Sequence, residues 1–402
     1  MGKSSRTKSN KMRIFSFCFL VLFFIFSISS QENKKNKWKE KVEVSGFVKY
    51  MNTTSVVDLD SLITDNLLHN RIRFKAYLSN KITTVIEMRN RIFYGEATRL
   101  NPYLGKVLEQ DNGQVDLSFV PLERKSVVIH SILDRAYMKY SEDNWELTLG
   151  RQRINWGVNL AFNPNDLFNA YSLVDFDYQE RPGVDAVRFQ YYGDDMSSFE
   201  GAVQIGNSLD SSVIAGLWKF NKWKYDFQFL AANYFKDIAI GTAWAGNIKN
   251  AGFKTEVSYF QPKTNFFESN GALSLSTTID YSFKKGTYIN ASILYNSSGK
   301  NKPINSSNLF QTFIGDISAK SLMPSKWTYF GQVSGAFNPA LNGSFAVFYM
   351  QGINLALFMP SIIYNINDDW ELMLTAQSAF GELKTKFQGM GSGIYLRTMY
   401  SF

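Results

Sequence analysis

IYLRTMYSF, residues 394–402, ends the chain with a strict two-residue alternation. One set of its side chains is apolar or aromatic apart from a single threonine, namely Ile394, Leu396, Thr398, Tyr400 and Phe402. RIRFKAYL at 71–78 alternates in the same way, with basic residues between apolar ones. Period-2 alternation gives a strand two chemically different faces. Segments of about 9–13 residues with this pattern recur from Val42 onward, which is the length that a tilted strand needs to cross a bilayer.

The composition fits strands that have one lipid face and one wet face. The chain has 402 residues, of which 16% are aromatic and 19% charged, and its mean hydropathy is −0.19. A helical membrane protein of this length would be far more apolar, and a soluble enzyme would carry fewer aromatic residues. A polar but aromatic-rich chain is what a membrane β-barrel requires, so we expect an all-β membrane fold rather than a soluble sandwich.

Turn signals divide the chain into strands joined by alternating short and long connections. Short turns are expected at sites such as Asn80-Lys81, Asp194-Asp195 and Asn367-Asp368-Asp369. The long connections are expected at 52–69, 95–126, 157–183, 261–270, 297–325 and 381–391. This pattern predicts a transmembrane antiparallel β-barrel of about 18 strands, with about 16 as the alternative. The barrel would occupy 42–402 and would be closed by the C-terminal strand, 391–402, pairing with 42–50.

Residues 1–30 have the pattern of a secretory signal peptide. Five cations precede an apolar stretch at 14–28, and the small residues Ser29 and Ser30 follow it. Residues 31–41 would then form a short charged lead-in in the periplasm. An uncleaved anchor is the alternative, although the apolar stretch is shorter than the roughly 20 residues of a spanning helix.

The ionisable and reactive residues give no support to an enzyme or a nucleic-acid-binding protein. Removal of the five cations would lower the formal net charge from +8 to +3, which is too small to indicate nucleic-acid binding. The one cysteine, Cys18, lies inside the apolar stretch and would be removed with it. The two histidines, His69 and His130, lie in no catalytic or metal-binding motif. We therefore expect no catalytic residues, no metal and no cofactor.

Three consecutive motifs resemble a known family. They are LGRQRINWG at 149–157, FNPNDLFN at 162–169 and ERPGVDAVRFQYY at 180–192. This block is similar to the alginate-export porin family and to related uncharacterised porin-like proteins. The resemblance implies a barrel in the outer membrane of a Gram-negative bacterium, present as a monomer or small homo-oligomer. Tyr400 and Phe402 also resemble the terminal-strand signal that the outer-membrane assembly machinery recognises.

Basic residues at i, i+2 spacing are the most informative polar feature. Such spacing places two cationic groups on one strand face, roughly 6–7 Å apart. The candidate pore-lining residues are Arg71, Arg73, Lys75, Arg89, Arg91, Arg151, Arg153 and Arg188. Two roles remain open for the arginines. They could form ion pairs with Glu87, Asp134 and Glu146 that stiffen the wall, or they could attract solutes.

The turn at Asn80-Lys81 sets the expected depth of the basic residues. Because that turn is periplasmic, Arg71 and Arg91 should lie toward the outer half of the wall, and Arg73 and Arg89 nearer its middle. Arg151 and Arg153 differ from the other arginines, because regular alternation would place them on the same strand face as the apolar residues before Gly150. We expect the strand to bulge near that glycine or to end there.

The connection 157–183 should fold into the lumen and narrow it. Its candidate constriction residues are Asn163, Pro164, Asp175, Asp177, Glu180, Arg181, Pro182, Gly183 and, just beyond it, Asp185. Because its acids lie close in sequence to several arginines, we expect salt bridges that pin the loop to the wall. Calcium binding by oxygen ligands is the alternative, although the spacing is not that of a defined calcium loop.

These features together predict a porin for small hydrophilic solutes. Arginine is cationic at every physiological pH, so an arginine-lined passage would prefer anions. Acidic sugars are the solutes that the family resemblance implies, and outer-membrane lipid and the assembly machinery would be the other partners. An outer-membrane hydrolase, or a surface-binding barrel without a transport role, is the alternative function.

Cleavage of the signal peptide should fall at or near Ser30 and leave Gln31 as the new N-terminus. The charged head, the apolar stretch and the small residues after it are the features that a signal peptidase requires. N-terminal sequencing of the protein extracted from membranes tests this expectation. Protein that begins at Met1 would contradict it.

Overall fold

The computed structural model describes residues 41–58, 61–111, 113–170, 177, 181, 183–302, 317–383 and 386–402. The chain divides into two compact units, Met1–Val42 and Glu43–Phe402, and the strand architecture belongs to the second. The expected signal peptide and nearly all of the lead-in lie outside the described residues, and so do Asp175, Glu180 and Pro182. Within the described ranges, no helix is both long enough and apolar enough to cross a bilayer.

Eighteen antiparallel strands form a closed barrel, to which β4 (Ser118–Arg124) adds one extra strand. The barrel strands are β1 (Val42–Asp58), β2 (Ser61–Tyr77), β3 (Ile82–Gly95), β5 (Val127–Glu142), β6 (Trp145–Gln152), β7 (Val184–Tyr192), β8 (Ser198–Gln204), β9 (Val213–Lys222), β10 (Tyr225–Tyr234), β11 (Asp237–Ile248), β12 (Ala251–Pro262), β13 (Ala272–Ser282), β14 (Tyr288–Asn296), β15 (Trp327–Asn338), β16 (Leu341–Met350), β17 (Leu355–Asn365), β18 (Trp370–Leu383) and β19 (Lys386–Ser401). The predicted fold class and strand count are confirmed.

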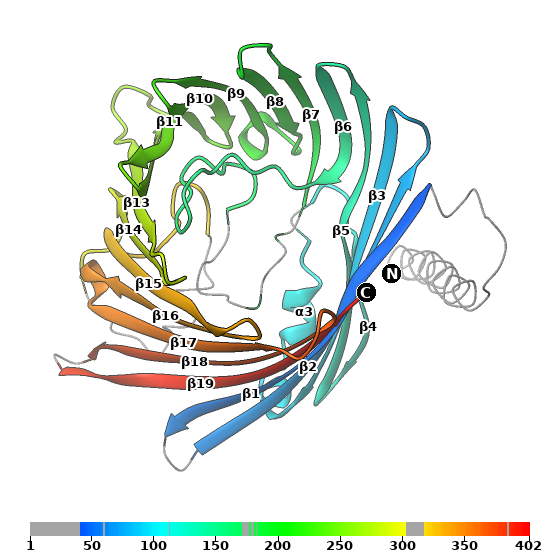
Figure 1. Cartoon of the computed structure of the whole chain (residues 1–402), viewed down its shortest axis with the longest axis vertical. Coiled ribbons are helices and arrows are strands. Elements are labelled where there is room, and N and C mark those ends of the chain that lie inside the picture. The colour runs from blue at the N-terminus through cyan, green and yellow to red at the C-terminus, as the bar shows by residue number, and fades with distance from the viewer. Residues whose placement is uncertain are drawn as a thin grey trace. The chain divides into compact units, whose positions relative to one another are not determined.

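β1 and β19 close the ring of strands (Figure 1). Their register places Phe47 opposite Ser401, and the N–H groups of Gly46 and Phe402 donate to each other's carbonyl oxygens just beyond that pair. The partner of the last strand is therefore 47–56 rather than 42–50. In a bilayer, an unpaired strand edge would leave backbone groups unsatisfied at a cost of several kcal/mol each, so this pairing is a condition for a membrane barrel.

The faces of the strands have the opposite polarity to those of a soluble protein. Large apolar side chains point outward and stay exposed, as Trp218 on β9 and Ile240 on β11 do. On β12 and β13, the inward face carries Glu256, Ser276 and Thr278, and each of these is 0% exposed. Apolar groups outside and polar groups inside are the arrangement of a barrel whose outer belt is covered by lipid.

Two apolar clusters lie inside the barrel, where chain segments pack against its wall. Trp156 and Phe168, from the segment 153–183 between β6 and β7 (the inner loop), pack against wall residues of β7 to β13. Phe162 of the same loop packs with Leu322, which precedes β15, against β14 to β17. Figure 1 shows the segment that follows β6 running inside the ring of strands. The interior is thus partly filled by the protein's own chain.

Two connections are much shorter than the sequence predicted. The expected loops 52–69 and 381–391 consist of the paired ends of β1 and β2 and of β18 and β19. Asn, Thr, Ser and Gly residues in these ranges resemble a loop in the sequence, but a wet strand face tolerates them. His69 consequently lies within β2 rather than at the end of a loop. The connection 95–126 is long, as expected, and holds α2 (Glu96–Leu100), α3 (Leu104–Leu108) and β4.

Gly150 changes the direction of the side chains on β6. Its φ is +112°, and a Cβ at this position would lie 2.4 Å from the carbonyl oxygen of Ala136, so the site requires glycine. The pairing register with β5 continues through Gly150, so the irregularity is one of backbone conformation rather than a shift of register. Arg151 is consequently buried, although Leu149 two residues earlier is exposed, and β6 ends at Gln152.

Deletion of Tyr400 to Phe402 should prevent assembly of the barrel. It removes the hydrogen bonds to Gly46 and the end of the β1–β19 ladder, which leaves an open edge. The measurement is the yield of heat-modifiable, folded protein in the membrane fraction. Ser401→Ala, which keeps the backbone ladder, is the control and should assemble normally. A normal yield from the truncated chain would show that closure does not depend on these residues.

Candidate functional site

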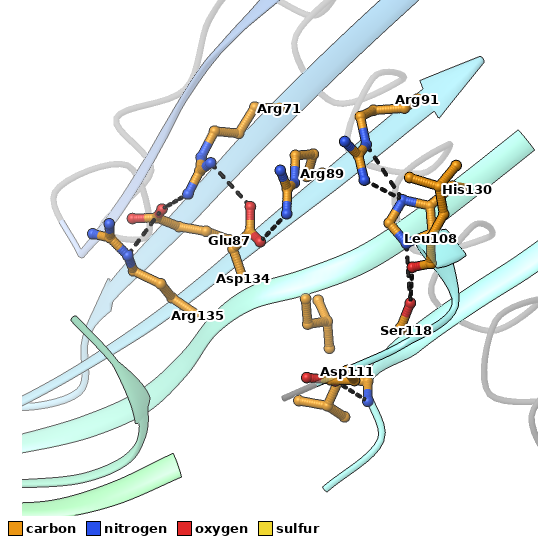
Figure 2. A network of polar contacts seen from close by, with 12 residues as sticks. Arg71, Glu87, Arg89, Arg91, Leu108, Asp111, Ser118, His130, Asp134 and Arg135 are labelled. Atoms are coloured by element: carbon orange, nitrogen blue, oxygen red, sulfur yellow. Dashed lines mark hydrogen bonds and ion pairs between the residues drawn. The ribbon is translucent and has the colours of Figure 1, made fainter. Parts of the chain in front are cut away.

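Two carboxylates on the inward face of the wall, Glu87 and Asp134, hold Arg71 of β2 and Arg89 of β3 (Figure 2). Arg71 reaches both of them, because its Nη2 lies 2.7 Å from Glu87 Oε2 and its Nη1 lies 3.0 Å from Asp134 Oδ2. Arg89 Nη2 lies 2.8 Å from the other oxygen of Asp134. None of these four side chains is more than 7% exposed. Loss of one partner from such a buried network costs about 3–5 kcal/mol, because it leaves an uncompensated charge.

Glu87 also faces two further arginines. Arg73 Nε lies 3.3 Å from Glu87 Oε1, and Arg135 Nε lies 3.6 Å from Glu87 Oε2. The Arg73 side chain is 46% exposed, whereas that of Arg135 is 14% exposed. Three guanidinium groups, including that of Arg71, therefore share this carboxylate. Among them, Arg73 presents its charge to water.

A β-bulge brings Asp134 to these arginines. The register of β3 with β5 shifts so that Arg135 pairs with Glu87 and Leu133 pairs with Met88, which leaves Asp134 as the extra residue. Strict alternation would place Asp134 and Arg135 on opposite faces of β5. Because a bulge re-aims a side chain, both can reach the same group of charges.

The register also corrects the depth that was expected for the basic side chains. Tyr77 pairs with Thr83 across the turn, which places Arg71 directly opposite Arg89. Arg71 and Arg89 therefore share one level of the wall, and Arg91 lies farther from the turn. The prediction paired Arg71 with Arg91, which is two residues out of register, because the length of the turn decides the register and was not known.

The contacts of His130 argue against a hydrolase at this site. Arg91 Nη2 lies 3.1 Å from His130 Nδ1, and arginine can only donate, so Nδ1 must accept and the ring proton lies on Nε2. Nε2 lies 3.0 Å from Ser118 Oγ, and the Ser118 hydroxyl donates to the Leu108 carbonyl oxygen at 3.1 Å. The histidine thus donates to the serine, whereas a hydrolytic base must accept the serine proton. Both side chains are buried.

Arg151 ties three chain segments together. Its Nη1 lies 2.8 Å from Asp111 Oδ2, and its Nε and Nη2 lie 2.9 and 3.0 Å from the two oxygens of Asp185. Its Nη2 also donates to the Val115 carbonyl oxygen at 2.6 Å. A two-pronged guanidinium–carboxylate pair of this kind is geometrically specific. Arg151 therefore fastens the connection after β3 to β6 and β7.

Glu200 on β8 joins the wall to the inner loop. Arg188 on β7 makes a two-pronged ion pair with it, at 2.7 and 2.8 Å. The indole N–H of Trp156 donates to the same carboxylate from the inner loop. Glu200 is buried, so the loop tryptophan and the wall arginine are held by one desolvated charge.

Glu256 on β12 binds the backbone of the inner loop directly. Its Oε1 accepts the N–H groups of Val158 and Asn159 at 2.6 and 2.7 Å, and its Oε2 accepts that of Asn165 at 2.9 Å. Charge-assisted hydrogen bonds of this kind are stronger than those between neutral groups. The carboxylate therefore anchors two separate turns of the loop to one point of the wall.

Asn165 of the FNPND motif and Asn159, which precedes the motif, supply the side chains that complete this anchor. Asn165 Nδ2 donates to the Thr242 carbonyl oxygen at 3.1 Å, and Ser258 Oγ donates to Asn165 Oδ1 at 2.6 Å. Asn159 Nδ2 donates to the Ser276 carbonyl oxygen at 3.2 Å. The loop is thus attached to β11, β12 and β13 by hydrogen bonds rather than by ion pairs.

Asp166 links the outgoing arm of the inner loop to its returning arm. Its Oδ2 lies 3.0 Å from Arg181 Nη1, and it is 1% exposed. Burial raises the pKa of Asp166 to about 6, and the positive charges of Arg181 and Arg153 oppose that rise.

Asp177 of the inner loop contacts the two strands that close the barrel. Its Oδ1 lies 2.8 Å from Lys49 Nζ on β1 and 3.2 Å from Arg397 Nη1 on β19. The loop is therefore also attached at the seam of the barrel, on the side opposite Glu256 in the order of strands.

The predicted site residues have the expected kinds of partner, but several partners are different. Glu146 pairs with Lys139 rather than with an arginine, and Lys75 lies 3.5 Å from Glu43. Asn163 and Pro164 are buried within the inner loop, and the N–H of Gly183 donates to the Asp134 carbonyl oxygen. Sequence reasoning missed Lys49, Asp111, Glu200, Glu256 and Arg397. Asp111 lies in the connection between α3 and β4, and the signal of the other four was only a charged residue at an inward position of a strand, which is common in a wet lumen.

The calcium alternative gains no support from the described part of the chain. Nowhere in it do three or more His, Cys, Asp or Glu side chains gather where they could hold a metal ion. Asp177 and Asp185, the described members of the acidic set, face cations of the wall instead.

Comparison with known proteins identifies the fold. No family model and no curated protein matches the chain. OccAB2 of Acinetobacter baumannii matches with a TM-score of 0.56 and 9% identity, over 92% of this chain and 99% of that one. OccK11 (OpdR) of Pseudomonas aeruginosa has a TM-score of 0.54 and 7% identity, over 90% and 96%. The outer membrane protein opdK of Pseudomonas aeruginosa has a TM-score of 0.52 and 8% identity, over 90% and 99%. At these identities the likeness shows the fold alone, which is a porin-like barrel.

Glu256→Gln should loosen the inner loop. One carboxylate oxygen becomes an NH₂ group that points at a backbone N–H, and the charge that strengthens the other bonds is lost. We expect a destabilisation of about 1.5–3 kcal/mol and a larger single-channel conductance in planar bilayers. Glu146→Gln, which removes an inward carboxylate without touching the loop, is the matched control. Conductance and stability equal to those of the wild type would show that Glu256 does not hold the loop.

Proposed function

We propose that this protein is an outer-membrane porin that lets small hydrophilic solutes, preferentially anions, diffuse through its lumen. The observation that carries the proposal is the closed barrel with an apolar outer belt and a charged, polar interior. The fold likeness supports it, because one of the matching structures is named an outer membrane protein.

The arrangement of charge in the wall supports anion preference. Arg71, Arg73 and Arg135 share the carboxylate of Glu87, and Arg71 and Arg89 share that of Asp134. Most of these groups are buried, so the role of stiffening the wall applies to them. Arg73 is both basic and half exposed, which is what a group that attracts solute requires. In this proposal the buried arginines stiffen the wall, and Arg73 attracts solutes.

The inner loop supplies the constriction in this proposal. It is attached at Glu200, Glu256 and the seam of the barrel, and it packs apolar residues against opposite parts of the wall. A segment held at three places inside the barrel narrows the passage. Because the motifs between 149 and 192 resemble those of alginate-export porins, acidic sugars are the solutes that we propose.

The remaining expectations form part of the same proposal. Export by a cleaved signal peptide, insertion by the outer-membrane assembly machinery, and a monomer or small homo-oligomer are all consistent with a barrel of this kind. The hydrolase alternative is disfavoured, because the hydrogen bonds of His130 and Ser118 run in the wrong direction for catalysis. A surface-binding barrel is disfavoured because the inner loop, a long connection, packs inside.

Arg73→Gln should lower the preference for anions. Arg73 is exposed and shares its carboxylate with two other arginines, so its replacement leaves Glu87 paired and the wall intact. Reversal potentials across a salt gradient measure the permeability ratio, which we expect to be anion-selective in the wild type and lower in the variant. Lys285→Gln, at an exposed turn, removes the same charge and should have a smaller effect. Cation preference in the wild type would refute the proposal, and an unchanged ratio would remove Arg73 from it.

A further inference from the structure

Three consecutive turns at one end of the barrel carry only basic charge. They join β9 to β10, β11 to β12 and β13 to β14, at the end of the barrel where β1 begins and β19 ends. Their five lysines are all exposed, and none of them forms an ion pair with another described residue. These five residues, the basic arc, are Lys222, Lys224, Lys249, Lys284 and Lys285.

The acids near the basic arc do not neutralise it. Asp226 and Asp280 lie at inward positions of β10 and β13. Asp280 Oδ1 lies 2.9 Å from Lys254 Nζ, and Asp226 accepts a hydrogen bond from Asn221 Nδ2 at 2.8 Å. Both carboxylates therefore face the lumen, where they already have partners.

The charge on this rim is segregated. Going round the rim from the basic arc, the next charged turns on both sides are acidic, namely Asp194-Asp195 between β7 and β8 and Asp368-Asp369 between β17 and β18. Exposed lysines are thus gathered over one part of the wall, β9 to β14, instead of alternating with acids.

Each turn of the basic arc places a large apolar side chain beside its lysines. Trp223, Ile248 and Phe283 are 76%, 51% and 47% exposed. Lys222 Nζ lies 4.8 Å from the centre of the Trp223 ring, and the Phe283 ring lies 4.7 Å from that of Tyr281. Exposed rings together with lysines are typical of the boundary between the lipid tails and the headgroups.

The turn between β9 and β10 keeps bulky residues where glycine is usual. Lys222 pairs with Tyr225, so Trp223 and Lys224 form a two-residue turn, and their φ angles are +56° and +65°. Turns with positive φ at both positions usually consist of Asn-Gly, because most side chains disfavour this backbone conformation. Retention of tryptophan and lysine in a strained turn indicates that these side chains have a role other than forming the turn.

We propose that the basic arc binds the headgroups of anionic phospholipids, such as phosphatidylglycerol, in the leaflet at this end of the barrel. This inference rests on the proposed function, because it takes the barrel to span the outer membrane with its short turns in the periplasm. Clustered lysines at a membrane surface attract lipids that carry a net negative charge. Successive turns at one end are two strands apart, which is about 10 Å, so each turn can contact a headgroup of its own.

The position of the apolar groups favours a lipid over a periplasmic protein as the partner. Ile248 lies at an outward position of β11, in the same row as the exposed side chains of Ile238 and Ile240. The apolar part of the basic arc thus continues the lipid-facing belt. A protein that approached from the periplasm would leave this part uncovered.

Replacement of all five lysines by glutamine in the full-length protein tests the inference. The probes are phosphatidylglycerol and phosphatidylcholine with the same acyl chains, added to the protein in a neutral detergent. Native mass spectrometry of the complexes gives their dissociation constants. Because each lysine near an anionic lipid surface contributes a factor of about five, we expect phosphatidylglycerol to bind at least about tenfold more weakly to the variant. Phosphatidylcholine should bind equally to both proteins.

A charge-matched variant is the control. It replaces five exposed lysines in connections at the opposite end of the barrel by glutamine, and it should bind phosphatidylglycerol as the wild type does. The five are Lys106, Lys125, Lys236, Lys300 and Lys302.

A second variant separates lipid binding from the structural role of the turn. Trp223→Asn combined with Lys224→Gly supplies the residues that the turn conformation favours, so the unfolding temperature should be equal or higher. The same variant loses one lysine and one ring of the basic arc, and we expect about fivefold weaker binding of phosphatidylglycerol. Unchanged lipid affinity in this variant would remove the turn between β9 and β10 from the site and overturn the argument from its strain.

The remaining outcomes distinguish this inference from the porin proposal. Unchanged phosphatidylglycerol affinity in the five-lysine variant would overturn the lipid site, and so would an equal loss in the charge-matched control. Loss of co-sedimentation with peptidoglycan in the five-lysine variant, without loss of lipid affinity, would assign the basic arc to an acidic polymer instead. The porin proposal is tested separately, by reversal potentials in bilayers of phosphatidylcholine, where the basic arc has no anionic headgroup to bind.

Discussion

Closure of the backbone ladder between β1 and β19 is the constraint on which the rest of the structure depends. A strand edge in lipid has no water to satisfy its N–H and C=O groups, so the chain must return to its first strand. Once the ring is closed, the outward face of each strand meets lipid and the inward face holds the polar residues. The inward charges then have to be satisfied from within the lumen, by one another or by chain that folds inside.

Carboxylates, more than arginines, organise that interior. Glu87 and Asp134 hold four arginines of β2, β3 and β5, while Glu200 and Glu256 hold the inner loop. The four are Arg71, Arg73, Arg89 and Arg135. Each has two oxygens with several lone pairs and can therefore gather two or three donors at one buried point. A guanidinium group that is held in this way is fixed in position and buried from water. The charge that is exposed on the inner face of the wall therefore comes from groups such as Arg73, which keep contact with water.

The inner loop links several of these charged groups across the interior of the barrel. It is attached to the wall at Glu200 and Glu256, and to the seam of the barrel through Asp177. The last of these attachments differs in kind, because the Asp177 side chain contacts two cations of the wall, whereas Glu256 accepts backbone N–H groups of the loop. A few buried charges therefore hold together segments that lie far apart in the chain.

Much of this architecture follows from the sequence alone, because alternation is a local property. The two-residue period at 71–78 and 394–402 determines which side chains face inward, and the turn signals determine the strand count. The irregularity at Gly150 was also predictable, since Arg151 would otherwise face lipid.

The pairing partners could not be predicted from the sequence. The contact of Glu256 with Val158 spans 98 positions, and the level of Arg71 depends on the register of a hairpin turn. The bulge that turns Asp134 inward could not be recognised from the alternation in the sequence, because an extra residue is defined only by the pairing with the partner strand. Local chemistry decides the faces of a barrel, whereas register and closure, which are properties of paired strands, decide which charges meet.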